Sequence, residues 1–217
     1  MTAMSVSGGE GQWLYGKWVQ APMQGRSRRS FMRFLEAAEG LLKGKHWHEV
    51  SVHEIVREAE ASVGSFYNRF SDKAALLHCL DDRLGLECEL TLESLEGELA
   101  HHPALVDDAP GIIVSVLIRL CEERRGIIRA LDLAHKMSGD DSFEGLGLRF
   151  DNAASRFATH LASCSERFHA VGAEKIARAF KETFWLAREQ LVYGAHEEDE
   201  RRLHSTLLRH FEASLSA

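Results

Sequence analysis

The sequence predicts an all-α protein, with an N-terminal three-helix unit of the helix-turn-helix type followed by a larger helical bundle. Only three prolines interrupt 217 residues, and 45% of the residues are apolar, enough for a substantial core. Apolar residues recur at the period of an α-helix in each long segment. Two serines suited to cap helices, Ser51 and Ser62, bound a segment that fits one short helix and a turn.

Charge is distributed unevenly along the chain. The formal net charge is −7, but residues 26–80 contain nine Lys and Arg against seven Asp and Glu, whereas residues 81–217 contain sixteen against twenty-five. The total argues against a general binder of polyanions. A weakly basic N-terminal part on an acidic body suits a local contact with nucleic acid.

Sequence features of membrane-bound or exported proteins are missing. No run reaches 18 apolar residues, and the opening MTAMSVSGGEGQW lacks the basic and apolar regions of a secretory signal. We therefore expect a cytoplasmic protein that makes no membrane contact. The cysteines show no CxxC spacing, which favours free thiols in a reducing compartment; they are Cys79, Cys88, Cys121 and Cys164.

The first helix is expected over residues 26–43, after an irregular, glycine-rich tail at residues 1–25. Arg26, Arg28 and Arg29 open this helix, and Gly44 ends it. Its apolar stripe has helical spacing and consists of Phe31, Leu35, Ala38 and Leu42.

The second and third helices are predicted to cross at a very short turn. Ser51 and Glu54 form the S-x-x-E capping box of the second helix, and Ser62 caps the third. Because only Glu60 and Ala61 separate the two helices, they must cross sharply, as in a helix-turn-helix.

The third helix, residues 63–70, has two unlike faces. At about 100° per residue, Phe66 and Phe70 share the buried side. The opposite face is small and polar, and it consists of Gly64, Ser65 and Asn68, with Val63 and Tyr67 at one margin. A glycine costs a helix about 1 kcal/mol relative to alanine, so Gly64 suggests the close approach of another surface.

Residues 59–76, AEASVGSFYNRFSDKAAL, closely resemble the DNA-binding signature of the tetracycline-repressor (TetR) family of bacterial transcriptional regulators. The resemblance extends over about Arg29 to Leu77. It rests on the Ser51 cap, on the run Ser62-x-Gly64-x-Phe66-Tyr67-x-x-Phe70, and on Lys73 before Leu76.

Two positions depart from the family pattern. Glu60 stands where the family commonly has glycine, which leaves the turn backbone less relaxed. Val63 stands where Lys or Arg is common, which removes a phosphate or base contact. The operator should therefore differ from those of typical relatives.

The resemblance implies a sequence-specific DNA-binding regulator, a repressor acting as a homodimer on a near-palindromic double-stranded operator. Residues 26–72 would bind DNA, and residues 73–217 would dimerise and receive a small-molecule effector. The third helix would enter the major groove, with Ser65 and Asn68 nearest the base edges and Val63 near a thymine methyl. The other predicted DNA-binding residues are Arg26, Arg28, Arg29, Ser51, Ser62, Gly64, Tyr67 and Lys73, of which Ser51, Tyr67 and Lys73 would hold phosphates.

The body is predicted to be a series of helices. Asp72 can cap a long helix ending near Leu99, and His101-His102-Pro103 interrupts it. Two helices follow within residues 110–138, with the apolar sets Ile112, Val116, Leu117, Leu120 and Ile127, Ile128, Leu131. Residues 143–168 carry one long stripe made of Phe143, Phe150, Ala154, Phe157, Leu161, Cys164 and Phe168.

A final helical hairpin is predicted from residues 173–193 and 197–215, with Gly194 at its turn. Its apolar faces exceed what one bundle core should need, which suggests pairing with a second copy. They consist of Ile176, Phe180, Phe184, Trp185, Ala187 and Leu191, and of Leu203, Leu207, Leu208, Phe211 and Leu215. In the family resembled, the last two long helices of each subunit form the dimer interface.

Four aromatic residues, Phe150, Phe157, Phe184 and Trp185, are candidates to line an effector pocket, although core packing competes as the role of each. Such rings would favour a hydrophobic or aromatic ligand over a sugar or nucleotide.

No pattern of an enzyme or a metalloprotein is found. The chain lacks HExxH, GxSxG, P-loop and GxGxxG motifs, and its paired histidines lack partners at ligand spacing. We expect no catalysis, no cofactor and no metal. The rival hypothesis is a helical ligand-binding or scaffold protein that has lost DNA binding, favoured by Glu60, Val63 and the small positive charge of residues 26–80.

Overall fold

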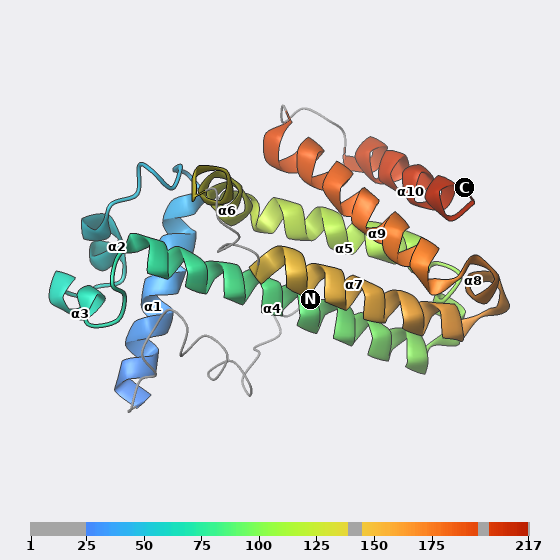
Figure 1. Cartoon of the computed structure of the whole chain (residues 1–217), viewed down its shortest axis with the longest axis horizontal. Coiled ribbons are helices and arrows are strands. Elements are labelled where there is room, and N and C mark those ends of the chain that lie inside the picture. The colour runs from blue at the N-terminus through green and yellow to red at the C-terminus, as the bar shows by residue number, and fades with distance from the viewer. Residues whose placement is uncertain (1–24, 139–144, 195–199, 217) are drawn as a thin grey trace. The chain divides into compact units, whose positions relative to one another are not determined.

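The computed structural model describes residues 25–138, 145–194 and 200–216, and within these residues the secondary structure is helical, without strands (Figure 1). The predicted all-α class is therefore confirmed. The predicted tail up to residue 24, Phe143, and the first three residues of the last predicted helix, 197–199, lie outside the described residues.

The chain divides into two compact units, Met1–Leu84 with Arg129–Gly145, and Gly85–Ile128 with Leu146–Ala217. Helices α4 (Lys73–His101) and α6 (Arg125–Ser138) contribute to both units. We call the described residues up to Leu84 the head and the second unit the body. The domain boundaries at residues 25 and 72 stay predictions.

The head contains the three predicted short helices, α1 (Gly25–Leu42), α2 (Val52–Glu58) and α3 (Val63–Tyr67). Helix α1 lies within one residue of its predicted range at each end, whereas α3 is shorter than predicted because it ends at Tyr67. The chain then continues through a turn in which the backbone N–H groups of Arg69 and Phe70 both donate to the Phe66 carbonyl, at 2.8 and 2.9 Å.

Four phenylalanine rings form the core of the head. Phe31 and Phe34 of α1 and Phe66 and Phe70 are all completely buried. The centroid of the Phe34 ring lies 5.6 Å from that of Phe66 and 5.9 Å from that of Phe70, and the Phe31 and Phe70 centroids are 5.6 Å apart. Phe34 was not part of the predicted stripe, yet it is the ring that connects α1 to α3.

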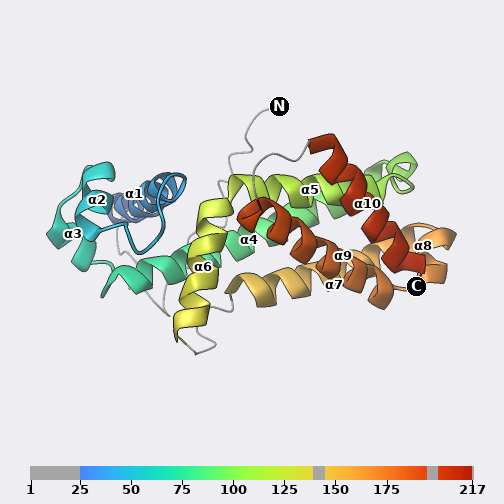
Figure 2. The ribbon, with the colours of Figure 1, turned by 90° about the horizontal axis from the view of Figure 1, so that it is seen from above.

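The body is a bundle built around α5 (Ala109–Glu123). This helix packs against α9 (Ala173–Arg188) and α10 (Glu200–Ser216), which also pack on each other (Figures 1 and 2). Helix α7 (Gly145–Cys164) runs beside α4, and two ion pairs join these helices. The paired atoms are Arg149 Nη1 with Glu89 Oε2 at 3.1 Å and Arg156 Nη2 with Glu93 Oε1 at 3.0 Å.

The breaks between the helices of the body lie where the sequence predicts them, and the structure has one further break. A 3-10 turn, η1 (Pro103–Leu105), follows the predicted His-His-Pro interruption. The predicted long helix up to Phe168 is divided, because the Ser165 hydroxyl accepts from the Phe168 N–H and starts a new helix, α8 (Glu166–Val171). Gly172 then adopts a φ of +86°, a conformation that disfavours side chains with a Cβ.

Two predictions about apolar faces were wrong. On α5 the buried residues are centred one position further along than predicted, so that Ile112, Val116 and Leu120 are only half-buried. The fully buried set is Ile113, Val114, Leu117, Ile118 and Cys121. Since α5 meets two other helices of the body, its apolar surface is wide, and periodicity alone does not locate the centre.

The predicted surplus of apolar surface on the last two helices is also not found. Most of the residues named for that surplus are buried inside the chain, namely Ile176, Phe180, Phe184, Ala187, Leu203, Leu207, Phe211 and Leu215. Of the others, Leu191 and Leu208 are half-buried, and Trp185 is 53% exposed. The buried members of these faces are therefore not available for pairing with a second copy.

A π-helical turn, η3 (Glu189–Tyr193), extends α9 up to Gly194. A Cβ at position 194 would lie 2.3 Å from the Gln190 carbonyl oxygen, so glycine is required there.

No helix among the described residues is long and apolar enough to cross a membrane. All four cysteines are free thiols, as predicted, and Cys79, Cys88 and Cys121 are buried. Within the same residues, no group of three or more His, Cys, Asp or Glu side chains is placed to hold a metal ion.

Candidate nucleic-acid interface

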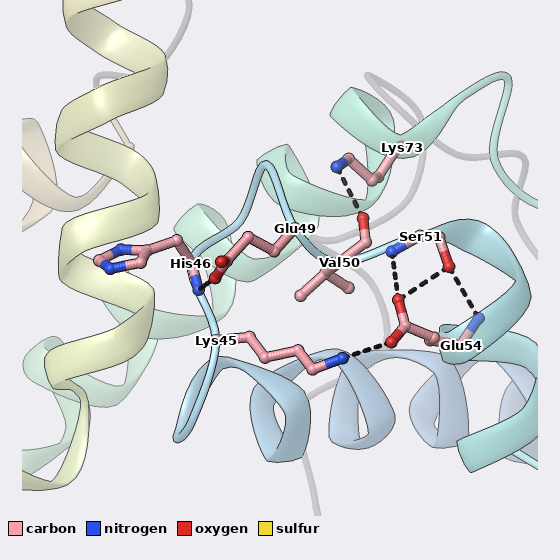
Figure 3. Close-up of polar contacts among 7 residues, drawn as sticks. All are labelled: Lys45, His46, Glu49, Val50, Ser51, Glu54 and Lys73. Atoms are coloured by element: carbon pink, nitrogen blue, oxygen red, sulfur yellow. Dashed lines mark hydrogen bonds and ion pairs between the residues drawn. The ribbon is translucent and has the colours of Figure 1, made fainter.

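The start of α2 carries the predicted capping box (Figure 3). The Ser51 hydroxyl oxygen accepts from the Glu54 N–H at 3.2 Å, and Glu54 Oε2 accepts from the Ser51 N–H at 2.9 Å. The Ser51 hydroxyl also donates to Glu54 Oε2 at 2.8 Å. These reciprocal bonds satisfy two N–H groups that the helix itself leaves unpaired and fix the direction in which α2 begins.

Glu54 is held in its charged form. Its carboxylate receives a bond from the Lys45 ammonium, and then bonds from the backbone and hydroxyl of Ser51, which together lower its pKa to about 2. An unfolded chain binds the proton at its ordinary pKa, near 4.3. The head is therefore stabilised by this carboxylate above about pH 4.3, and that contribution is lost as the pH falls toward 2.

Replacing Glu54 by glutamine should accordingly make the head less stable at neutral pH. The difference from the wild-type protein should shrink as the pH is lowered from about 4.3 toward 2, because the wild-type carboxylate becomes protonated in that range. Thermal unfolding of both proteins at a series of pH values measures this. A difference that stays constant across the range would show that the Glu54 charge plays no part.

Helix α3 presents the outward face that its sequence predicts. The Ser62 hydroxyl accepts from the Ser65 N–H at 3.1 Å and caps the helix, while Phe66 points into the core. Gly64 and Asn68 are exposed, and Tyr67 is 54% exposed. The angular assignment made from the sequence is thus confirmed for Gly64, Phe66 and Asn68, whereas Ser65 and Val63 are half-buried.

Nothing inside the head requires a glycine at position 64. A Cβ placed there would have the Ser62 hydroxyl oxygen, at 3.9 Å, as its nearest neighbour, which is ordinary van der Waals contact. The backbone of Gly64 also lacks the positive φ that would call for glycine. The described fold therefore leaves room for a side chain at position 64.

The turn before α3 contains a residue in a left-handed conformation. Glu60 has a φ of +45°, which costs a residue with a side chain about 1 kcal/mol and costs glycine nothing. Arg33 of α1 holds this turn, since its Nη2 donates to the Glu60 carbonyl at 3.2 Å and to Glu60 Oε2 at 3.1 Å. The suspicion that Glu60 strains the turn is confirmed, and α1 supplies a compensating contact.

The loop between α1 and α2 is fastened to the start of α4, which the sequence did not predict. The Lys73 ammonium donates to the Trp47 and Val50 carbonyls, both at 2.8 Å, and lies 4.6 Å from the centre of the Trp47 ring. Partial burial lowers the pKa of Lys73. In the sequence, this contact between the loop and α4 was indicated only by two apolar residues in the loop, Trp47 and Val50.

The predicted N-terminal contacts belong to α1. Arg26, Arg28 and Arg29 lie in the N-terminal part of α1, and Arg29 is exposed.

The four aromatic residues predicted to line an effector pocket do not share one environment. Phe150, Phe157 and Phe184 are buried; the centroids of the Phe150 and Phe184 rings are 4.2 Å apart, and Phe157 packs on Phe180. Trp185 is largely exposed. A groove of about 390 Å³ lies elsewhere in the body, between the start of α5 and α10. It is lined by Asp107, Asp108, Pro110, Gly111, Ile112, Ser115, His204, Leu208 and Glu212.

Comparison with known proteins gives a family match and a similarity of fold. Residues 34–80 match the family model described as bacterial regulatory proteins, tetR family. No curated protein sequence matches the chain. A crystal structure of a protein assigned to the TetR family of transcriptional regulators, from Mesorhizobium loti MAFF303099, has a similar fold, with a TM-score of 0.66 and 20% sequence identity. The alignment covers 89% of this chain and 98% of that chain.

The matched residues contain α2, α3 and the turn between them, which are the elements that present the outward face of α3. The fold match extends over the body as well. Residues 34–80 therefore resemble bacterial regulatory proteins of the tetR family, and the chain shares the fold of a protein assigned to that family.

Proposed function

We propose that this protein represses transcription by binding a near-palindromic DNA operator through α3, and that a small apolar ligand releases it. The observation that carries the DNA-binding part is the outward face of α3. It combines a glycine that the fold does not require with small polar side chains, on a helix held from behind by a fully buried aromatic core. Such a face allows close approach to base edges in the major groove.

Within this face the contacts divide by chemistry. Asn68 and Ser65 can donate to and accept from base edges, and Val63 offers an apolar contact for a thymine methyl. Ser51 and Tyr67 are exposed and would hold phosphates, which fixes the position of the head without selecting a sequence. In a homodimer the two heads would contact half-sites about one helical turn apart, roughly 34 Å.

Replacing Asn68 by alanine should relax the base preference at one position of each half-site. The expected loss of discrimination is about 1–3 kcal/mol at that base pair, because an asparagine amide can make two bonds to an adenine. Affinities for a set of single-base operator variants measure it. If all variants lose affinity equally, Asn68 holds the backbone and does not distinguish bases.

Homodimerisation is proposed through α9 and α10, with an exposed aromatic patch as its centre. Trp185 is 53% exposed and Tyr193 is 44% exposed, and the Arg188 guanidinium lies 4.6 Å and 5.4 Å from the centres of their rings. Tryptophan, tyrosine and arginine are the residues that most often dominate the binding energy of protein interfaces. This patch, and not the buried stripe of α9, supports the pairing.

Replacing Trp185 by glutamate should convert the protein from dimer to monomer in sedimentation experiments, because a charge would replace the central aromatic contact. Operator affinity should fall with it, since two linked heads bind more tightly than one. Leu105, 37% exposed on η1, provides the control, and Leu105→Glu should remain dimeric. A Trp185→Glu protein that stays dimeric would place the interface elsewhere.

Release by an apolar ligand requires space that the described aromatic cluster lacks. A ligand among Phe150, Phe157 and Phe184 has to separate rings that are in contact with each other or with Phe180. A native mass spectrum of the purified protein tests for such a ligand. Expression from a reporter gene placed behind the operator tests repression, because deleting the regulator should raise it.

The rival, a scaffold that has lost DNA binding, is separated from this proposal by a gel shift with the DNA flanking the protein's own gene at several salt concentrations. A regulator binds with an affinity that falls steeply with salt. A scaffold does not bind. Glu60 no longer favours the scaffold, because Arg33 holds the turn in the conformation that a helix-turn-helix needs.

A further inference from the structure

The loop at residues 43–51 is held from both sides. On the side of α2, Lys45 pairs with Glu54, which also receives the Ser51 N–H. On the side of α4, the Lys73 ammonium bonds to the Val50 carbonyl, as Figure 3 shows. It also bonds to the Trp47 carbonyl. Within the loop, the His46 N–H donates to Glu49 Oε2 at 2.8 Å.

The ammonium of Lys73 differs from a cation available to DNA. Two of its three N–H donors are directed at the Trp47 and Val50 carbonyls, at 2.8 Å each, and the Trp47 ring lies against it. Loss of solvent around the amine also lowers its pKa, whereas Arg29 is exposed. A cation whose donors are already satisfied by the protein gains less from a phosphate than an exposed one.

We propose that Lys73 is a positioning residue, which acts on DNA binding by fastening the loop to α4 and not by neutralising a phosphate. This inference rests on the proposed DNA-binding function, and it differs from the phosphate contact that the family resemblance suggests for this position.

A few residues connect the bond made by Lys73 to the orientation of α3. The Val50 carbonyl that Lys73 holds directly precedes Ser51, and the Val50 side chain is 1% exposed. Ser51 caps α2, and α2 leads into α3 through the two residues Glu60 and Ala61. Releasing the carbonyl therefore frees the point at which α2 begins and lets the outward face of α3 change its angle.

The test compares Lys73→Met with Arg29→Gln in the full-length protein. Methionine keeps the length of the side chain and removes all three donors. We expect Lys73→Met to lower operator affinity by roughly tenfold or more, as for the loss of charge-assisted bonds, with an unchanged slope of log affinity against log salt. Arg29→Gln, which removes an exposed cation, should reduce the magnitude of that slope by about 1. A reduction of about 1 for Lys73→Met would overturn the inference, because it is the signature of a lost phosphate contact.

Hydrogen exchange supplies a second reading that does not depend on DNA. Amides of residues 46–51 should exchange faster in Lys73→Met than in the wild-type protein, while those of α3 should keep their protection. Lys73→Arg should restore both the loop protection and the affinity, because a guanidinium can donate to both carbonyls and stack on Trp47. Unchanged exchange in the loop of Lys73→Met would also overturn the inference.

Two further outcomes remain distinguishable. If the wild-type protein binds no DNA, the proposed function fails, while the exchange experiment still decides whether Lys73 fastens the loop. If Lys73→Met does not fold, Lys73→Gln takes its place, because glutamine keeps an N–H₂ donor but has no charge. The salt dependence of its operator affinity and the hydrogen exchange of its loop are measured in the same way.

Discussion

Replacing Gly64 by glutamate is expected to abolish operator binding while leaving the head at least as stable as before. The position is open in the free protein, with the nearest neighbour of an added Cβ at 3.9 Å, so the side chain can be accommodated. An acidic residue in the first turn of a helix also complements the helix dipole. In a complex, the same carboxylate would face the phosphates, and like-charge contacts cost several kcal/mol, which corresponds to a loss of on the order of a hundredfold or more.

Two control variants separate the causes of this loss. Gly64→Gln has the same shape without the charge and should lose less affinity. Gly64→Ala should stabilise the head by about 0.5–1 kcal/mol, because alanine is the better helix former. Thermal unfolding and operator titration of the three variants measure both effects. Wild-type affinity in Gly64→Glu would mean that α3 does not face the DNA.

Replacing Phe66 by alanine is expected to destabilise the head by about 3–5 kcal/mol. Phe66 is completely buried, and its ring lies against Phe34 and Phe70, at centroid distances of 5.6 and 5.1 Å. A cost of this size is a large part of the stability of a typical domain, about 5–15 kcal/mol. Because Phe66 is the anchor that turns the rest of α3 outward, DNA binding should be lost together with the fold, as denaturant unfolding and operator titration can show.

The neighbouring residue provides a matched comparison. Tyr67 follows Phe66 directly but is 54% exposed, so Tyr67→Ala should leave most of the stability in place. It should still weaken operator binding, because Tyr67 lies on the face proposed to meet the DNA. If Tyr67→Ala binds normally while Phe66→Ala unfolds, the two faces of α3 are assigned correctly but Tyr67 makes no contact.

Local signals explain what the sequence could predict about the head. Capping at Ser51 and Ser62 involves residues within a few positions of each other, and so does the separation of Phe66 from Gly64 and Asn68 on opposite sides of one helix. The strain at Glu60 was anticipated from the family resemblance, because the family commonly has glycine at this position. These features are encoded by neighbours along the chain, and the structure reproduces them.

What the sequence did not predict depends on partners distant in the chain. Arg33 meets Glu60, which lies 27 positions away, and Lys73 meets Trp47, which lies 26 positions away. A lysine at the start of a helix looks the same in sequence whether its ammonium faces a phosphate or a pair of carbonyls. Only the placement of the loop against α4 distinguishes the two.

The same reason limits prediction in the body. A wide apolar face on α9 or α10 looks identical whether a helix of the same chain or of a second copy covers it. Here α5 of the same chain contacts both helices, which leaves Trp185 and Tyr193 as the exposed aromatic surface. The candidate effector residues Phe150, Phe157 and Phe184 show the same ambiguity, since a stripe of phenylalanines can fill a core as well as line a pocket.

The central claim, that the outward face of α3 binds operator DNA, is tested most directly by titrating wild-type protein and Gly64→Glu against the DNA flanking the protein's own gene. Both titrations are made at several salt concentrations between about 50 and 200 mM, a range over which phosphate contacts change affinity strongly. We predict tight, salt-dependent binding by the wild-type protein and none by Gly64→Glu, with both proteins equally folded. Equal binding by the two proteins would contradict the claim.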